Sequence, residues 1–179
     1  MSGRFHRWRR ETVFGLAAFV AFAGGGPASA GDVGYVTSQE AETLSFVDLD
    51  RMKVEATISI PGKPAGIAVS RDGRRAYVSQ PDSRQIAIVD TVSRKLIGEV
   101  DVGGGPLGIA VHPSGSPVYV ADWYSHSLLL VDPEKRAVVG SFETGQSPSG
   151  VVESASGEAV VTADLDDAFP DISGGAIPR

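Results

Sequence analysis

The feature that most constrains the fold is a repeat of 42 residues. Five positions of the repeat keep the same residue at this spacing, and no insertion separates one copy from the next. The recurring residues are Tyr35, Tyr77 and Tyr119; Asp48, Asp90 and Asp132; Pro64, Pro106 and Pro148; Gly66, Gly108 and Gly150; and Gly73, Gly115 and Gly157. Chance does not produce five columns with one interval. The chain is therefore built from copies of one structural unit.

Each copy has the pattern of four short strands. In the middle copy the predicted strands are 65–70, 75–79, 85–90 and 95–102, and we expect the last of them to be half buried and outermost. They are rich in Val, Ile and Tyr and are bounded by Gly, Pro, Asp and Ser. Four antiparallel strands in a period of about 40 to 45 residues are typical of a β-propeller blade. The predicted fold class is therefore all-β, with blades that cover one another's apolar faces by stacking.

The first thirty residues have the pattern of an export signal. Basic residues come first, an apolar run follows at 13–23, and Ala28-Ser29-Ala30 matches an A-x-A cleavage site. The apolar run is shorter than the roughly 20 residues that span a bilayer. We predict a signal peptide over 1–30, cleavage after Ala30 and export to the periplasm or the cell exterior, by the general secretory route rather than twin-arginine export. A signal anchor that is never cleaved is the alternative.

The composition narrows the chemistry that the chain can perform. None of its 179 residues is a cysteine, which excludes disulfides, thiolate zinc sites, iron–sulfur clusters and cysteine nucleophiles. The formal net charge of −6 argues against nucleic-acid binding, which needs a basic surface. An acidic exported protein without disulfides suits a bacterial periplasm or cell surface. We predict no nucleic-acid partner, no membrane span after signal cleavage and no cofactor.

Three motifs of the repeat carry a family resemblance. The second predicted strand of each copy contains Gly34-Tyr35-Val36-Thr37-Ser38, Ala76-Tyr77-Val78-Ser79-Gln80 or Val118-Tyr119-Val120-Ala121-Asp122. The third predicted strand ends with Phe46-Val47-Asp48, Ile88-Val89-Asp90 or Leu130-Val131-Asp132. The first predicted strand, in two copies, includes Pro64-Ala65-Gly66-Ile67-Ala68-Val69 or Pro106-Leu107-Gly108-Ile109-Ala110-Val111. They resemble the YVTN family of β-propeller repeats of exported bacterial and archaeal surface proteins. The resemblance covers about residues 34–164 and implies a propeller of about seven blades. Members of such a family share an architecture more than a chemistry.

The repeat covers just over three blades. Its fourth copy loses the pattern after about Asp167, where Pro170 and Gly174 replace a strand residue and the repeated Asp. We expect repeats over 31–167 and an irregular tail over 168–179. Closed propellers have about four to eight blades, so an open stack leaves two apolar faces bare. Three explanations are open: a truncated or frame-shifted propeller, self-association into a ring, and an open array capped by its tail or a partner.

Two loops of each copy are expected on one face of the propeller, because the strand order resembles that of WD-repeat blades. The candidate ligand-binding residues are Asp122, Trp123, Tyr124 and His126, with Gln80 on the corresponding loop of the preceding copy. Aromatic faces stack on other rings and histidine can gate protonation. We interpret 122–126 as a recognition patch for a sugar, a peptide or a quinone-like ring. The alternative is a loop that packs its own ring against the next blade, with Gln80 solvated.

Other polar residues have structural interpretations. We expect His112 to be a turn residue, and the repeated Asp48, Asp90 and Asp132 to form Asx turns after their strands. The acidic residues near the end of the chain are expected to form a solvated tail; they are Asp164, Asp166, Asp167 and Asp171. No nucleophile elbow or catalytic set is visible, so we predict no catalytic and no metal-ligating residue.

The leading functional hypothesis is an exported propeller module that binds a protein or a ligand at the cell envelope. The resemblance also allows an alternative, which is part of a propeller enzyme or of a quinone-linked (pyrroloquinoline quinone) oxidation system, such as a lactonase or a quinoprotein amine dehydrogenase-like protein. Whether the chain is an enzyme is left open. Self-association through the open blade faces is a further expected interaction.

Overall fold

The structure is a computed structural model that describes residues 20–22 and 32–162. These residues form β-strands joined by turns, in three four-stranded antiparallel sheets and one two-stranded sheet. Blade 1 contains β1 (Val20–Phe22), β2 (Val33–Ser38), β3 (Thr43–Asp48) and β4 (Lys53–Ser59); blade 2 contains β5 (Ile67–Val69), β6 (Arg75–Gln80), β7 (Gln85–Asp90) and β8 (Lys95–Asp101); blade 3 contains β9 (Pro106–Val111), β10 (Val118–Asp122), β11 (Ser127–Asp132) and β12 (Ala137–Glu143); and partial blade 4 contains β13 (Gly150–Glu153) and β14 (Ala159–Thr162).

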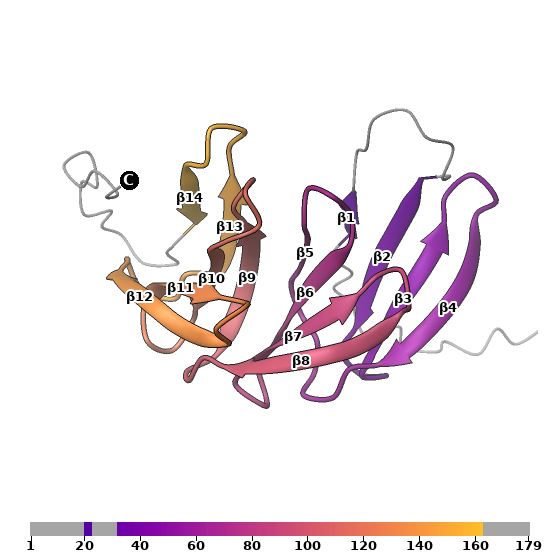
Figure 1. Ribbon diagram of the computed structural model, residues 1–179. Coiled ribbons are helices and arrows are strands. Elements are labelled where there is room, and N and C mark those ends of the chain that lie inside the picture. Colours follow the sequence, from indigo (N-terminus) through magenta and orange to yellow (C-terminus); the bar gives the residue numbers. More distant parts are fainter. Residues whose placement is uncertain (1–19, 23–31, 163–179) are drawn as a thin grey trace, which may run out of the picture.

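The blades stand side by side in chain order, with their first strands as neighbours near a common axis (Figure 1). This arrangement confirms the predicted all-β fold of about three blades plus a partial one. The first strand of blade 2 is shorter than its predicted range of 65–70. The reason is that Ala65 and Gly66 exchange backbone hydrogen bonds with Ser79 at 2.9 Å without continuing the regular ladder.

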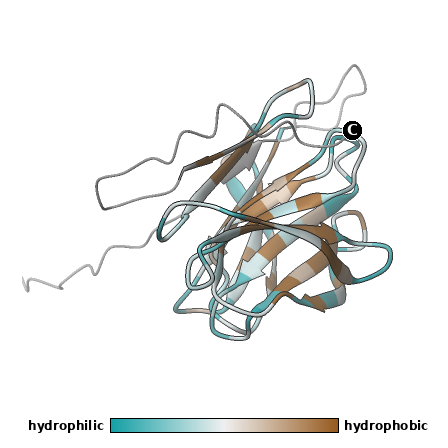
Figure 2. Ribbon diagram, turned by 90° about the vertical axis from the view of Figure 1, so that its left-hand side faces the viewer, coloured by the Kyte–Doolittle hydropathy of each residue, from teal (hydrophilic) through white to brown (hydrophobic). Residues whose placement is uncertain are grey.

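The hydrophobic core lies between blades rather than within them. One layer joins the face of blade 1 to that of blade 2, with Tyr35, Leu44, Phe46 and Ile60 opposite Ile67, Ala76, Val78, Ala87 and Val89. The next layer joins blade 2 to blade 3, with Tyr77, Ile86, Ile88, Val100 and Val102 opposite Ile109, Val118, Val120, Leu129 and Val131. Figure 2 shows the apolar residues concentrated on the strands and the hydrophilic residues on the turns. Each blade thus depends on its neighbour for burial of its apolar surface.

The repeated glycines have two distinct structural reasons. A Cβ atom on Gly66 would lie 2.3 Å from the Leu107 carbonyl oxygen, and one on Gly108 would lie 2.7 Å from the Ser149 carbonyl oxygen. The first strands of neighbouring blades therefore approach each other at a distance that only glycine permits. The other repeated glycines, Gly73, Gly115 and Gly157, have positive φ in the turn between the first and second strands.

Hydroxyl groups join neighbouring blades close to the axis. The buried Thr37 of β2 donates to the carbonyl oxygen of Ala65 at 2.8 Å, and Ser79 of β6 donates to that of Leu107 at 2.6 Å. Both bonds span 28 residues and link one blade to the next. The corresponding residue of blade 3 is Ala121, which has no hydroxyl group. The contact between blade 3 and partial blade 4 therefore lacks this bond.

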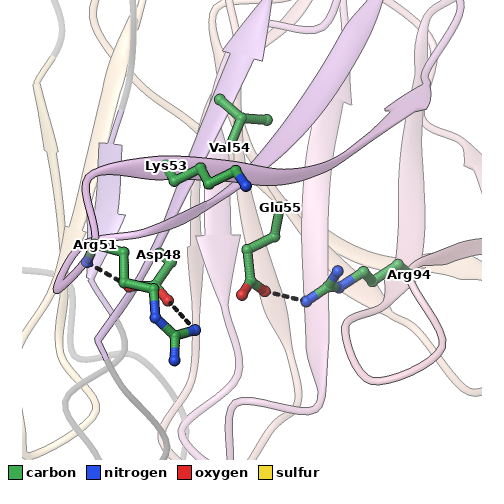
Figure 3. A pocket seen from close by; sticks show the side chains of 6 residues that line it. All are labelled: Asp48, Arg51, Lys53, Val54, Glu55 and Arg94. Atoms are coloured by element: carbon green, nitrogen blue, oxygen red, sulfur yellow. Dashed lines mark hydrogen bonds and ion pairs between the residues drawn. The ribbon is translucent and has the colours of Figure 1, made fainter.

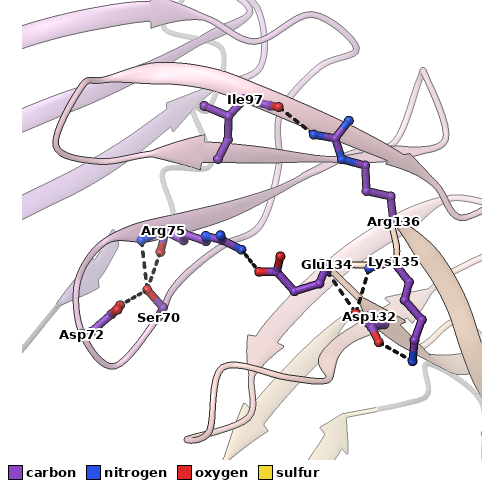
Figure 4. A network of polar contacts seen from close by, with 8 residues as sticks. All are labelled: Ser70, Asp72, Arg75, Ile97, Asp132, Glu134, Lys135 and Arg136. Atoms are coloured by element: carbon purple, nitrogen blue, oxygen red, sulfur yellow. Dashed lines mark hydrogen bonds and ion pairs between the residues drawn. The ribbon is translucent and has the colours of Figure 1, made fainter.

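Arginines also join neighbouring blades through partly exposed contacts. Arg75 of β6 pairs with Glu134 of blade 3, and Arg136 donates to the carbonyl oxygen of Ile97 in β8 at 3.0 Å (Figure 4). Arg94, 42 residues before Arg136, pairs with a carboxylate of blade 1. Because these contacts are exposed, each adds little to the free energy of unfolding.

The outer surfaces of the array remain accessible. The outermost strands β4, β8 and β12 are largely exposed, more than the half burial that the sequence predicted. Phe142 of β12 is 41% exposed, whereas its counterpart Val100 is 2% exposed between blades 2 and 3. Within the described ranges, no helix has the length and apolar character needed to cross a membrane. The predicted tail over 168–179 lies outside the described residues, as does the predicted leader apart from 20–22.

Candidate functional site

The hairpin between β10 and β11 is held in place by one carboxylate. Asp122, at the end of β10, is 1% exposed. Its Oδ1 atom accepts backbone N–H bonds from Gly105 at 2.8 Å, Tyr124 at 3.1 Å and Ser125 at 3.2 Å. Burial disfavours the charged form, but the Ser125 hydroxyl and these backbone groups outweigh it and hold the pKa of Asp122 below its usual range. Asp122 therefore fixes the backbone of the hairpin between β10 and β11.

A glycine loop supports the exposed ring of the hairpin. A Cβ atom on Gly105 would lie 2.5 Å from the Tyr124 ring, so the ring lies directly over the backbone of that residue. A Cβ atom on Gly104 would overlap the Asp122 carboxylate in the same way, and Trp123 donates its backbone N–H to the Gly105 carbonyl oxygen at 3.0 Å. Tyr124 is nevertheless 74% exposed. The outer face of its ring is accessible to a ligand.

The remaining residues of the hairpin border this ring. Trp123 is half-buried and His126 is exposed. His126 has a φ of +52°, and its Nδ1 atom accepts the backbone N–H of Ser147 at 3.0 Å. The loop before β13 is thereby fixed against the hairpin. One corner of blade 3 thus carries Trp123, Tyr124 and His126 together, next to the buried Asp122.

Gln80 lies apart from this corner. It occupies in blade 2 the position of Asp122 and is 0% exposed, so the expectation that it is solvated is wrong. Its Nε2 atom donates to the Pro61 carbonyl oxygen at 2.7 Å and to a Glu99 carboxylate oxygen at 3.1 Å. The amide therefore ties the hairpin of blade 2 to the preceding loop. In this position the side chain organises the scaffold and is closed to a ligand from solvent.

Sequence reasoning missed the part that glycine plays at the site. Residues 103–105 are three glycines, whereas the corresponding loops read Pro61-Gly62-Lys63 and Gly145-Gln146-Ser147. The hairpin departs from the repeat in the same blade, because Trp123 and Tyr124 replace Pro81 and Asp82 of blade 2. Two departures from the repeat that meet in space are the signal that could have identified the pair.

His112 and the three repeated aspartates have the turn roles that the sequence predicted, whereas the acidic cluster at 164–171 lies outside the described residues. Asp48, Asp90 and Asp132 each accept a backbone N–H from three residues further on, at 2.8, 2.6 and 3.0 Å. The Nδ1 atom of His112 accepts the backbone N–H of Ser114 at 3.2 Å within its turn. These residues close turns, as expected. In the part of the chain that the structure describes, no three His, Asp or Glu side chains are grouped so that they could share a metal ion.

A pocket of about 560 Å³ lies away from the hairpin, at the outer rim between blades 1 and 2. Its lining residues are Asp48, Arg51, Lys53, Val54, Glu55 and Arg94. Arg51 pairs with Asp48, and Arg94 pairs with Glu55 (Figure 3). The charges that line the pocket are thus engaged largely with one another.

Comparison with known proteins agrees with the fold. A family model described as YNCE-like beta-propeller matches residues 17–114, more than half of the chain. The structure is similar to that of Kuenenia stuttgartiensis hydrazine synthase, with a TM-score of 0.66 and 28% identity over 70% of this chain and 36% of that chain. The structure of U3-55K, with a TM-score of 0.59 and 13% identity over 74% of this chain and 45% of that one, is similar in fold alone. No curated protein matches the chain. The chain spans about a third of the hydrazine synthase chain and less than half of the U3-55K chain.

Proposed function

We propose that this chain, which belongs to the YNCE-like β-propeller family, is an exported binding module whose ligand contacts the hairpin of blade 3. The family membership confirms the propeller repeat that the resemblance indicated. It assigns no chemistry, because a fold hosts many functions. The function must therefore be argued from the residues that the scaffold does not need.

The observation that carries the proposal is the exposed ring of Tyr124 over Gly105. The repeated residues are accounted for by turns, close strand approach and burial between blades. Trp123, Tyr124 and Gly105 are replaced by Pro81, Asp82 and Lys63 in the preceding copy of the repeat, so the architecture does not require them. An accessible aromatic face on a rigid support suits the stacking of a sugar ring, a proline ring or another planar ring. A protein or a small ligand could supply such a ring.

The proposal is tested with Trp123 as a fluorescent reporter. Trp8 and Trp123 are the two tryptophans of the chain, so Trp8→Phe leaves a reporter at the site. In this background we would titrate a soluble oligosaccharide, a proline-rich peptide and a water-soluble quinone. We expect one of these probes to give a saturable change that Tyr124→Ala weakens about tenfold, the size of one lost stacking contact.

Asp82→Ala provides the matched control for that experiment. Asp82 is the exposed counterpart of Tyr124 on the hairpin of blade 2. The control variant should bind the probe as the parent does. Absence of any saturable response, or equal weakening by both substitutions, would contradict a binding site on the blade 3 hairpin.

A second candidate function is a component of a propeller enzyme. The similarity to hydrazine synthase at 28% identity favours it, because that protein is named as an enzyme. A quinone-linked dye-reduction assay and a lactonase assay on the purified chain test this candidate. Turnover above that of a Tyr124→Ala, His126→Ala double variant would support an enzymatic role for the same corner.

The proposed location is the periplasm or the cell exterior. The basic start, the apolar run and the small residues before Gly31 support export. The open blade faces support a further proposal, which is contact with a second copy of the chain. Fractionation of cells that express the full chain, followed by mass measurement of the exported product, tests the location.

A further inference from the structure

Strand β1 pairs with β2 in the same way as the first strands of the other blades pair with their neighbours. In blades 1, 2 and 3 the first strand is antiparallel to the strand that carries the repeated Tyr, with an alanine opposite that Tyr, and three consecutive residue pairs are equivalent. The pairs are Val20–Val36, Ala21–Tyr35 and Phe22–Gly34; Ile67–Val78, Ala68–Tyr77 and Val69–Ala76; and Ile109–Val120, Ala110–Tyr119 and Val111–Val118. The Val-Ala-Phe of β1 therefore corresponds to the Ile-Ala-Val of β5 and of β9.

The strict repeat does not predict this strand. In blades 2 and 3 the alanine precedes the tyrosine by nine positions, whereas Ala21 precedes Tyr35 by fourteen. Counting 42 residues back from β5 leads to Gly25-Gly26-Pro27, which is a poor strand sequence. The chain thus uses an apolar segment that lies five residues earlier.

Two further observations place β1 in the propeller. It contacts β5, as β5 contacts β9 and β9 contacts β13, so the first strands form one continuous row (Figure 1). The family match also begins at residue 17 and therefore includes β1. Strand pairing and neighbouring strands agree on one position for this segment, and the family match includes it.

We infer that residues 20–22 are the inner strand of blade 1 and that the inner edge of β2 is the site that accepts them. Without β1, backbone N–H and C=O groups along that edge of β2 would lose their partners. The same three residues lie in the apolar run of the predicted leader. Cleavage after Ala30 would separate β1 from the rest of blade 1. Residues 20–22 can therefore either be removed with the leader or complete blade 1, but not both.

The absence of cysteine from the chain makes a direct test possible. The full chain would carry Val20→Cys together with Val36→Cys, since these residues are directly opposite each other. Opposite Cα atoms in an antiparallel pair are about 4.5 to 5.5 Å apart, which is within the range that a disulfide bridges. The control carries Ala21→Cys with Val36→Cys, which is one position out of register. Intact mass and resistance to thiol alkylation measure disulfide formation after mild oxidation.

We expect the in-register pair to form its disulfide at least about tenfold faster than the control pair. Equal rates for the two pairs would mean that residues 20–22 have no fixed register, and no disulfide in the first pair would mean that they are not beside β2. Either result would overturn the inference. Neither pair of positions lies on the blade 3 hairpin, so the outcome is independent of the proposed binding function.

Discussion

Single residues in this protein divide into those that repeat and those that do not. The repeated Tyr, Gly and Asp residues each have a structural reason, which is burial between blades, close strand approach or an Asx turn. Residues outside the repeat include Trp123, Tyr124 and Glu153. Asp122 is also outside the repeat, since Gln80 occupies its position in blade 2. The consequences of substitution should differ accordingly.

Removal of the Asp122 charge should destabilise the chain at neutral pH. Asp122→Asn keeps one acceptor oxygen but weakens three hydrogen bonds, with an expected cost of about 1 to 2 kcal/mol in the free energy of unfolding. The lowered pKa of Asp122 means that its contribution is complete above the usual carboxyl pKa and is lost as the pH falls through the folded value. The variant should therefore lose less stability than the parent on acidification.

Urea unfolding at pH 7 and pH 3 measures this effect. Asp82→Asn, on the matching hairpin of blade 2, is the control and should behave as the parent. A variant of Asp122 that is as stable as the parent at pH 7 would show that the carboxylate does not hold the hairpin.

Glu153 should make the stability of the chain depend on pH in the opposite sense. It occupies in β13 the position of Val69 and Val111, its Oε1 atom is buried without a hydrogen-bond partner, and burial raises its pKa to about 7. Since the folded state holds the proton more tightly than the unfolded chain, the free energy of unfolding should fall as the pH rises from about 4.5 to about 7. Glu153→Val should remove that fall.

Thermal unfolding at pH 5 and pH 8 tests the role of Glu153. The melting temperature of the variant should exceed that of the parent most at pH 8, where the parent carries a buried charge. Glu143→Val, at the exposed end of β12, is the control and should leave the difference between the two pH values unchanged. A parent whose melting temperature is the same at both values would contradict the assignment.

At the scale of elements, the sequence predicts the regular strands well and the irregular ones poorly. The strand predicted over 85–90 coincides with β7 (Gln85–Asp90), because its apolar residues lie between turn residues at both ends. Strand β1 was missed, since its distance from the repeated Tyr differs from that of β5 and its residues also suit a leader. The loop at 122–126 was predicted, but its glycine support depends on a contact across 17 residues that spacing alone does not reveal.

Close approach of first strands should make Gly66 intolerant of a side chain. Gly66→Ala places a Cβ atom 2.3 Å from a backbone oxygen of the next blade, so blades 2 and 3 must separate. We expect a loss of about 1 to 3 kcal/mol. Gly140→Ala is the matched control, because its Cβ atom would meet only the Leu130 side chain at 3.7 Å. Equal chemical-denaturation midpoints for the two variants would show that the first strands are not this close.

At the scale of the whole molecule, the described residues bury some blade faces more completely than others. The layers between blades 1, 2 and 3 are complete, whereas the layer between blade 3 and β13–β14 involves fewer buried residues. Leu130 is only partly buried and Phe142 is exposed, whereas their counterparts in blade 2, Ile88 and Val100, are buried. The described residues thus leave the outer part of this face of blade 3 accessible.

Self-association should follow from that accessible face. The average mass of the chain in light scattering should rise with concentration, because a second copy can cover Phe142 as blade 3 covers Val100. Phe142→Ser should shift the rise to concentrations about tenfold higher, whereas Val54→Ser, on the outer strand of blade 1, should not. A mass that does not change with concentration in the parent would contradict association through this face.

The order in which the blades are stacked is most directly measured by nuclear Overhauser effects between methyl groups. Leu44 and Ile60 should show contacts to Val78 and Val89, and Ile86 and Val100 should show contacts to Val120 and Val131. No contact should join the first pair to the last, since blade 2 lies between them. Contacts between Leu44 or Ile60 and Val120 or Val131, or the absence of the predicted contacts between neighbouring blades, would contradict the stacked propeller.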